Sequence, residues 1–297
     1  MDQTASTPSI TEPAQVSTVA GRSKGPNIPG IIGTIFTLIM AAIWAFPLYW
    51  AVITSLKREN DVLDTPPSFF PIPLTFKAYT NVLAESGLLR WYFNSIFTAV
   101  VITFLVVLLC MLCAYALSQL EFPGKNVLFW MLLAGFMIPG QALVVPLFIL
   151  MYDLGSINTY QGIILPQLIA PVVIIIYKQF FDAVPRELRD SAVIDGANEG
   201  RILFNVFLPI NWGITVALAI VTFIGAWNAF FWPFLITTSE QMMTIPVGIT
   251  QVQDAFGVQY ARTMAVAVLA GLPVAVAYLI FQRQVTEGIM ATAGIKG

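Results

Sequence analysis

Histidine is missing from this sequence, and charged residues are few. None of the 297 residues is a histidine, and Asp, Glu, Lys and Arg together make up 10% of the chain. The absence of histidine removes the commonest general acid–base, the base of the usual catalytic triad and the commonest metal ligand. Soluble domains carry about 25% charged residues, so the low charge indicates a chain that lies largely in lipid.

Cysteine, basic charge and phosphate-binding glycines are also scarce. The two cysteines, Cys110 and Cys113, lie inside an apolar run, whereas a redox or metal site needs polar, partly exposed thiolates. The net charge of −2 leaves no basic stripe for nucleic acid, which we exclude as a partner. The loop G-x-x-x-x-G-K-[ST] that binds nucleoside triphosphates does not occur in the sequence. We therefore expect this chain to be no enzyme and to hold no metal and no cofactor.

Apolar residues make up 58% of the chain, and the mean hydropathy is +0.81. A membrane-spanning helix needs about 20 mostly apolar residues, and six stretches qualify. They predict an all-α polytopic membrane protein with spans over residues 31–56, 92–117, 127–151, 162–181, 212–236 and 264–281. Residues 28–297 form the expected membrane domain. Residues 1–27 are rich in Ser, Thr, Pro and Gln and lack the apolar core of a signal peptide, which predicts a disordered cytoplasmic tail.

Proline and glycine interrupt three of the six stretches. Such residues predict broken helices beside a cavity, or else ordinary packing kinks. The positions are Pro139, Gly140, Pro146, Pro166, Pro171, Gly271 and Pro273.

The distribution of Lys and Arg predicts which side of the membrane each loop faces. An even number of spans puts both termini on one side. That side holds Arg22, Lys24, Lys125, Lys178, Arg186, Arg189, Arg201, Arg283 and Lys296. The opposite side holds Lys57, Arg58, Lys77, Arg90 and Arg262. Because cytoplasmic loops carry the excess of Lys and Arg, both termini are expected to be cytoplasmic.

A charged island at about residues 183–210 separates the fourth and fifth stretches. Charge of this density cannot lie in lipid, so the island is expected to be aqueous and to face a soluble partner. Its pattern predicts two short amphipathic helices joined at Gly196, where glycine can adopt a left-handed conformation. Arg186 and Asp190 are four residues apart and are expected to pair. Leu203, Val206 and Phe207 form the expected apolar face of the second helix.

The island resembles the cytoplasmic signature of the membrane subunits of ATP-binding-cassette importers. That signature reads E-A-A, three residues, G, nine residues, I-x-L-P. Here it reads Asp190-Ser191-Ala192, three residues, Gly196, nine residues, Val206-Phe207-Leu208-Pro209. Further segments resemble the carbohydrate branch of that family, the maltose-type inner-membrane permeases. They are residues 117–125, Met137-Ile138-Pro139, Pro146-Leu147-Phe148, Ala226-Trp227-Asn228 and Pro233.

The resemblance implies a permease subunit of a bacterial sugar importer in the cytoplasmic (inner) membrane. Its implied partners are a second, non-identical permease, an ATPase dimer that binds ATP and Mg²⁺, an extracytoplasmic sugar-binding protein and the carbohydrate itself. The island would be the coupling loop that docks into the ATPase. Its candidate contact residues are Glu187, Asp190, Ala192, Asp195, Gly196, Ala197, Leu208 and Pro209.

Side chains that would touch sugar or the binding protein are suggested by their chemistry. An aromatic face stacks on a sugar ring and amides bind hydroxyls, so Gln141, Trp227 and Asn228 are candidates for the pathway. Helix packing would explain the same three residues. Amides and one acid in the last outer loop are candidates for contact with the binding protein, unless that loop is only a connector. They are Gln251, Gln253, Asp254 and Gln259.

Two other function classes remain open from sequence. A secondary carrier working alone would transport without ATP and respond to an ion gradient, but no ionisable residue lies clearly at mid-membrane to serve it. A membrane scaffold would show no solute flux. Importers of amino acids or peptides share the cytoplasmic signature, so a non-sugar substrate is a further alternative.

Overall fold

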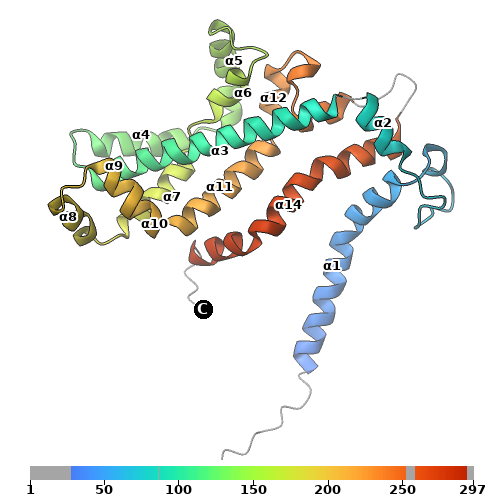
Figure 1. The fold of residues 1–297 in the computed structure, drawn as a ribbon, viewed down its shortest axis with the longest axis horizontal. Coiled ribbons are helices and arrows are strands. Elements are labelled where there is room, and N and C mark those ends of the chain that lie inside the picture. Colours follow the sequence, from blue (N-terminus) through green and yellow to red (C-terminus); the bar gives the residue numbers. More distant parts are fainter. Residues whose placement is uncertain (1–27, 86, 252–257, 293–297) are drawn as a thin grey trace, which may run out of the picture. The chain divides into compact units, whose positions relative to one another are not determined.

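A computed structural model describes residues 28–85, 87–251 and 258–292. Over these residues every regular element is a helix (Figure 1). The contacts divide the chain into two units, one up to Pro47 and one from Leu48 onward, and each is described by itself. The predicted tail, residues 1–27, lies outside the described residues.

The boundary between the two units lies within helix α1 (Ile28–Ser55), whose last turns belong to the second unit. The helix is long and apolar enough to cross a membrane, which agrees with the span predicted at 31–56. Within the second unit, its last turns hold the loop that follows. The Tyr49 hydroxyl donates to the Phe69 carbonyl at 2.6 Å, and the hydroxyls of Ser55 and Tyr79 lie 2.7 Å apart.

Helix α3 (Leu88–Gln119) is the central element of the second unit. Helices α7 (Pro171–Asp182) and α11 (Trp212–Trp227) pack along it, α14 (Tyr260–Thr292) packs against α11, and α2 (Lys77–Glu85) packs against α14 (Figure 1). The apolar length of α3 and α14 agrees with the second and sixth predicted spans. Pro273 lies inside α14, which stays one helix rather than breaking. We call the Gln119 end of α3 the loop end and the Leu88 end the cap end.

The third, fourth and fifth spans are bent, and in the third and fourth the bend lies at Pro and Gly residues that predicted broken or kinked helices. The third span breaks by 95° between α4 (Lys125–Met137) and the 3₁₀ turn that leads into α5 (Val144–Asp153). The fourth span bends by 47° before α7. At the first break Ile138 is extended, because the residue before a proline is disfavoured in helical conformation. The fifth span ends at Trp227 instead of 236. Pro233 explains this, since its ring would clash with the carbonyl of residue 229 in a continuous helix.

Short elements complete the chain. In chain order they are η1 (Glu59–Asp61), α4 (Lys125–Met137), η2 (Gly140–Leu143), α5 (Val144–Asp153), α6 (Tyr160–Ile164), η3 (Leu165–Gln167), α8 (Arg186–Ile194), α9 (Glu199–Ile202), η4 (Leu203–Phe207), α10 (Leu208–Ile210), α12 (Phe231–Ile236), η5 (Glu240–Met242), α13 (Ile245–Gly248) and η6 (Ile249–Gln251).

Two apolar clusters fix the two ends of α3. At the loop end, the rings of Tyr115, Phe181 and Phe207 meet edge to face, with centroids 5.2–6.2 Å apart. At the cap end, Trp91 and Trp227 are buried with Leu88 and Ile245. Edge-to-face aromatic packing adds about 0.5–1.5 kcal/mol per pair beyond the area it buries. The loop end is therefore well braced against α7 and the island.

Asn94 holds the cap segment, residues 240–245, onto α3. Its amide nitrogen donates to the carbonyls of Gln241 and Met243, both at 2.8 Å. Its amide oxygen accepts from the hydroxyl of Tyr160 at 2.7 Å. Asn94 is fully buried, so loss of these bonds would leave polar groups without partners. One side chain thus joins α3, α6 and the cap segment.

Gly248 permits the close approach of α13 to Trp91. A Cβ at position 248 would lie 2.3 Å from two ring atoms of Trp91. That ring is fixed by its Nε1, which donates to the Glu240 carbonyl at 2.9 Å. We expect Gly248→Ala to destabilise the protein by about 1–3 kcal/mol, as overpacking does. Thermal unfolding in detergent measures this, with Gly225→Ala as control because no atom lies within 4 Å of a Cβ there. Equal melting temperatures for the two variants would contradict the expectation.

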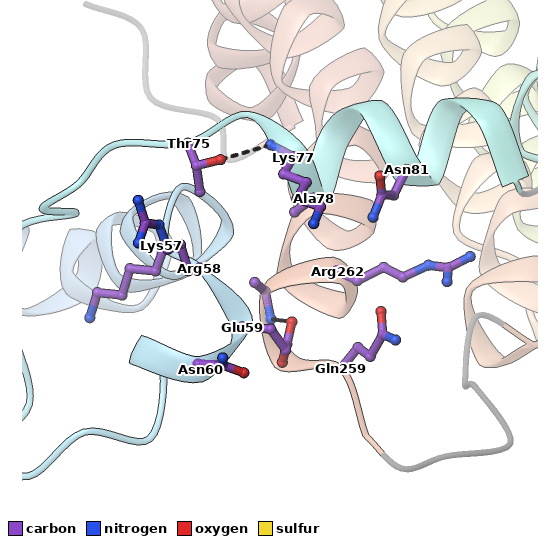
Figure 2. A pocket seen from close by; sticks show the side chains of 11 residues that line it. Lys57, Arg58, Glu59, Asn60, Thr75, Lys77, Ala78, Asn81, Gln259 and Arg262 are labelled. Carbon is purple, nitrogen blue, oxygen red and sulfur yellow. Dashed lines mark hydrogen bonds between the residues drawn. The ribbon is translucent and has the colours of Figure 1, made fainter.

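A polar cavity of about 400 Å³ opens in the second unit (Figure 2). It lies between the segment that follows α1, helix α2 and the start of α14. Its lining is Lys57, Arg58, Glu59, Asn60, Thr75, Lys77, Ala78, Asn81, Gln259, Ala261 and Arg262.

Candidate functional site

Helix α8 presents an exposed surface of mixed apolar and acidic character. Leu188, Val193 and Ile194 are exposed apolar residues, and Ile194 reaches 85%. Glu187 and Asp190 on the same helix are exposed as well. A helix of nine residues that exposes apolar side chains beside charges is typical of a docking surface. This is the first of the two island helices predicted from the sequence.

Gly196 ends α8 in a left-handed conformation, with φ at +77°. The Ala197 N–H donates to the Ala192 carbonyl, and the Gly196 N–H donates to the Val193 carbonyl, both at 3.0 Å. These two bonds form the Schellman motif, in which glycine occupies the left-handed position. The predicted glycine joint is confirmed. It turns the chain sharply between Asp195 and the second helix, so three of the predicted contact residues share one tight turn.

The second island helix begins at α9 and continues through a π turn, η4, into α10. Asn198 caps it by accepting a hydrogen bond from the Arg201 N–H at 2.9 Å. Leu203 and Phe207 are buried, which confirms the predicted apolar face. Leu208 is half-buried and Pro209 is exposed, so the end of the signature lies where the chain turns by 86° into α11.

Glu199 links the island to α3. Its carboxylate accepts from the hydroxyl of Tyr115 on α3 and from the guanidinium of Arg189 on α8, each at 2.5 Å. Burial by itself lowers the pKa of Arg189, but hydrogen bonds to Tyr115 and Glu199 raise it above its ordinary value, so the guanidinium stays charged. Because Tyr115 is buried at the loop end, both island helices are tied to the central helix.

The expected pairing of Arg186 with Asp190 is wrong. The ion pairs of the described residues include Arg189 with Glu199 instead. An arginine placed four residues before an acid is the weaker orientation on a helix, whereas Arg189 reaches across the turn to a partner already held by Tyr115. Sequence reasoning missed this trio, because nothing in the pattern brings residue 115 to residue 199. The helix cap at Asn198 could have been predicted, because asparagine is a preferred residue directly before the first turn of a helix.

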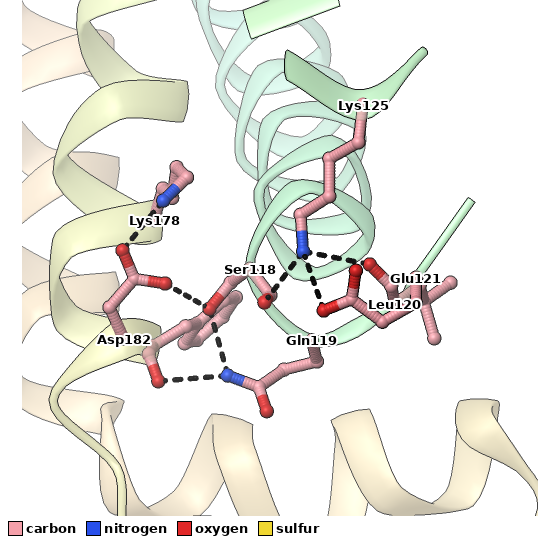
Figure 3. A network of polar contacts seen from close by, with 8 residues as sticks. Ser118, Gln119, Leu120, Glu121, Lys125, Lys178 and Asp182 are labelled. Atoms are coloured by element: carbon pink, nitrogen blue, oxygen red, sulfur yellow. Dashed lines mark hydrogen bonds and ion pairs between the residues drawn. The ribbon is translucent and has the colours of Figure 1, made fainter. Parts of the chain in front are cut away.

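A second polar network joins α3, α4 and α7 at the loop end (Figure 3). Ser118 donates to Asp182 at 2.6 Å, and Asp182 pairs with Lys178 at 2.6 Å. Lys125 donates to the carbonyls of Ser118 and Leu120 at 3.3 and 2.8 Å. These bonds satisfy carbonyls at the end of α3 that have no partner within the helix. The network fixes α4 and α7 beside the island.

The three sequence-predicted pathway residues lie in different environments. Trp227 is 2% exposed, and its ring packs against Tyr92 and Phe223. Asn228 is exposed at the end of α11, and its amide donates to the Ile224 carbonyl at 3.0 Å. Gln141 is exposed in the turn after the 95° break. In this conformation the faces of the Trp227 ring are covered by protein.

The predicted binding-protein contacts are only partly described. Gln253 and Asp254 lie outside the described residues, and Gln251 is described only as the last residue of η6. Gln259 lines the polar cavity of Figure 2.

The chain matches a family model described as "Binding-protein-dependent transport system inner membrane component" over residues 107–289. Among curated proteins it is 33% identical to an arabinooligosaccharides transport system permease protein of Halalkalibacterium halodurans, over 93% of this chain and 99% of that protein. It is 32% identical to a trehalose/maltose transport system permease protein of Thermococcus litoralis, over 90% and 96% of the two chains. A sulfoquinovosyl glycerol transport system permease protein of Agrobacterium fabrum is 32% identical over 85% and 89%.

The fold resembles that of a solved transporter chain. The structure is that of a bacterial ABC transporter involved in the import of the acidic polysaccharide alginate. The likeness has a TM-score of 0.79 and covers 88% of this chain and 98% of that one, at 23% sequence identity. The bent helices thus belong to a known membrane fold.

Proposed function

Because this chain belongs to the family of binding-protein-dependent transport system inner membrane components, we propose that it is one permease subunit of an ATP-driven importer of di- or oligosaccharides. The carbohydrate assignment is supported by relatives whose names specify transport of arabinooligosaccharides and of trehalose or maltose. One observation supports the role as a transport subunit: helix α8 is exposed, and Glu199 links it by hydrogen bonds to the central helix α3.

The energy for transport would come from a separate ATPase dimer, which binds ATP and Mg²⁺. The ATPase docks on the α8 surface, where apolar side chains would be buried and the acids would meet cations. The proposed coupling residues are Glu187, Asp190, Ala192, Asp195, Gly196, Ala197, Leu208 and Pro209. When the ATPase closes, it moves this surface, and Glu199 transmits the displacement to Tyr115 on α3.

The sugar pathway would be shared with a second, non-identical permease. Gln141 and Asn228 are exposed and carry amides that bind hydroxyls, which supports both as contacts. Trp227 would reach the sugar only in a state in which Tyr92 and Phe223 withdraw from its ring.

An extracytoplasmic binding protein would deliver the sugar on the side opposite α8. Gln251, Gln253, Asp254 and Gln259 are the proposed contacts of the last outer loop. Both termini and the island would be cytoplasmic, which follows from the excess of Lys and Arg on that side.

Capture of this chain from native membranes in mild detergent tests the proposal. A second permease and an ATPase are expected to co-purify, and proteoliposomes of the complex are expected to take up sugar only with internal ATP. Uptake by this chain alone, driven by an ion gradient, would instead establish a secondary carrier. Flux of peptides or amino acids without sugar flux would overturn the substrate class.

A further inference from the structure

The polar cavity of Figure 2 gathers most of the positive charge of one side of the protein. Five basic residues are predicted on the extracytoplasmic side: Lys57, Arg58, Lys77, Arg90 and Arg262. All except Arg90 line this one cavity. Cations are disfavoured outside the cytoplasmic membrane face, so their concentration at one place needs a reason.

The cavity carries a formal charge of +3, from four cations and the single acid Glu59. Glu59 already has a structural partner, because its Oε2 accepts from the Ala261 N–H at 3.0 Å. That bond joins η1 to the start of α14 and holds the two walls together. The negative charge inside the cavity is therefore outnumbered and partly engaged.

Two of the four cations are buried and two are exposed. Lys57 is 3% exposed; its Nζ donates to the Ser68 carbonyl at 2.6 Å and lies 4.8 Å from the centre of the Trp50 ring. Arg262 is 9% exposed and stands on the α14 wall, across from η1 and α2 (Figure 2). Arg58 and Lys77 are exposed, and neither has an ion pair among the described residues. Arg58 and Lys77 are thus available to an incoming anion.

We propose that this cavity receives a carboxylate side chain of the extracytoplasmic binding protein. The inference rests on the proposed function, which supplies a soluble partner on this side. Among the other lining residues, Asn60, Asn81 and Gln259 carry amides that offer hydrogen bonds to a carboxylate. A volume of about 400 Å³ admits an acidic side chain and its neighbours but not a folded domain.

A positively charged cavity of this kind mainly affects the rate at which the permease and the binding protein associate. Exposed charges of opposite sign steer association and fix its register, and their effect falls with ionic strength. Docking at the cavity would place the binding protein against η1, α2 and the start of α14, next to the loop that holds Gln259.

Hexaglutamate labelled with a fluorophore is the first probe, added to the purified complex in nanodiscs of zwitterionic lipid at low salt. Binding is expected for the wild type, and the double variant Arg58→Gln/Lys77→Gln is expected to bind about tenfold more weakly. Arg90→Gln is the matched control, since Arg90 lies on the same side, outside the cavity, and is expected to change binding less than about twofold. Hexaglutamine is expected not to bind.

The second measurement uses the binding protein that stimulates the wild-type complex. The double variant is expected to raise the concentration needed for half-maximal ATPase activity and to leave the maximal rate unchanged. At high salt, the concentration of binding protein needed for half-maximal ATPase activity is expected to be the same for the double variant and for Arg90→Gln. A lowered maximal ATPase rate would instead indicate that the segment between α1 and α2 is misfolded, and it would overturn the proposal.

Other sources of negative charge give distinct results. Inorganic phosphate that displaces hexaglutamate at equal concentration would make the cavity a site for small anions and overturn docking. An effect of the double variant that appears only with anionic lipid would assign it to a headgroup. If the wild type imports sugar with ATP and both variants respond equally to the binding protein, this proposal fails while the proposed function stands.

Discussion

Gly196→Val is expected to lower ATP-driven uptake about tenfold while the protein still inserts and assembles. Position 196 has φ at +77°, and a β-branched side chain is strained there by about 1–2 kcal/mol. Relief of that strain requires the turn between α8 and α9 to change, which re-aims the exposed face of α8. A shift of 1–2 kcal/mol alters the population of the docking conformation by about 5–30-fold.

The reason is conformational, so the choice of residue at 196 provides the controls. Nothing lies within 4 Å of a Cβ at this position, which excludes a simple clash. Asparagine tolerates the left-handed region, so Gly196→Asn is expected to keep most of the uptake. Gly200→Ala changes a neighbouring glycine whose Cβ would make an ordinary contact at 3.6 Å with Asn198, and it is expected to be neutral.

Uptake and ATPase activity of the same proteoliposomes measure the effect. The expected result for Gly196→Val is ATP hydrolysis that no longer follows the sugar, with normal amounts of complex. Wild-type uptake by this variant, or equal losses for valine and asparagine, would disprove the role of the left-handed turn.

Glu199→Ala is expected to reduce the sugar imported per ATP by several-fold. The substitution removes the acceptor of the buried Tyr115 hydroxyl, and an unsatisfied buried group costs about 1–3 kcal/mol. The ion pair with Arg189 adds less than about 1 kcal/mol, because the Glu199 side chain is 44% exposed and water screens it. Without Glu199, α8 can move while α3 stays in place.

A double-mutant cycle with Tyr115→Phe separates this link from general instability. If Glu199 acts through Tyr115, the two single variants and the double variant are expected to show similar uptake ratios. Glu199→Gln retains an oxygen that accepts from Tyr115 and is expected to rescue part of the ratio. Glu121→Ala is the control on the same side, because Glu121 is 82% exposed and Lys125 keeps its two carbonyl partners. Fully additive losses would show that Tyr115 and Glu199 act separately.

The helical class and the island could be predicted because both depend on local signals. Spans follow from runs of about 20 apolar residues, and the turn at Gly196 follows from a glycine after a short amphipathic helix. The same local rule was ambiguous for proline. Pro139 lies at a 95° break, whereas Pro273 lies within the single helix α14. Neighbouring helices decide between the two outcomes, and a single sequence does not contain their positions.

The contacts that join distant segments could not be predicted. Tyr115 and Glu199 are separated by 84 positions, and Asn94 and Met243 by 149. A tyrosine or asparagine in an apolar helix looks the same whether it is a bonded anchor or a packing residue. The cavity of four cations was equally invisible, since its members come from the segment after α1, from α2 and from α14.

Because α3 is held firmly at both ends, a movement of one end is transmitted to the other. With 32 residues the helix is about 48 Å long at 1.5 Å per residue, which exceeds the hydrocarbon thickness of about 30 Å. The aromatic cluster and Glu199 hold the loop end of α3, and Asn94 holds the cap segment at the cap end. A small tilt imposed beside α8 therefore becomes a displacement of the cap on the far side of the membrane. Under the proposed function, a movement of the ATPase beside α8 would in this way reach the cap segment on the other side of the membrane.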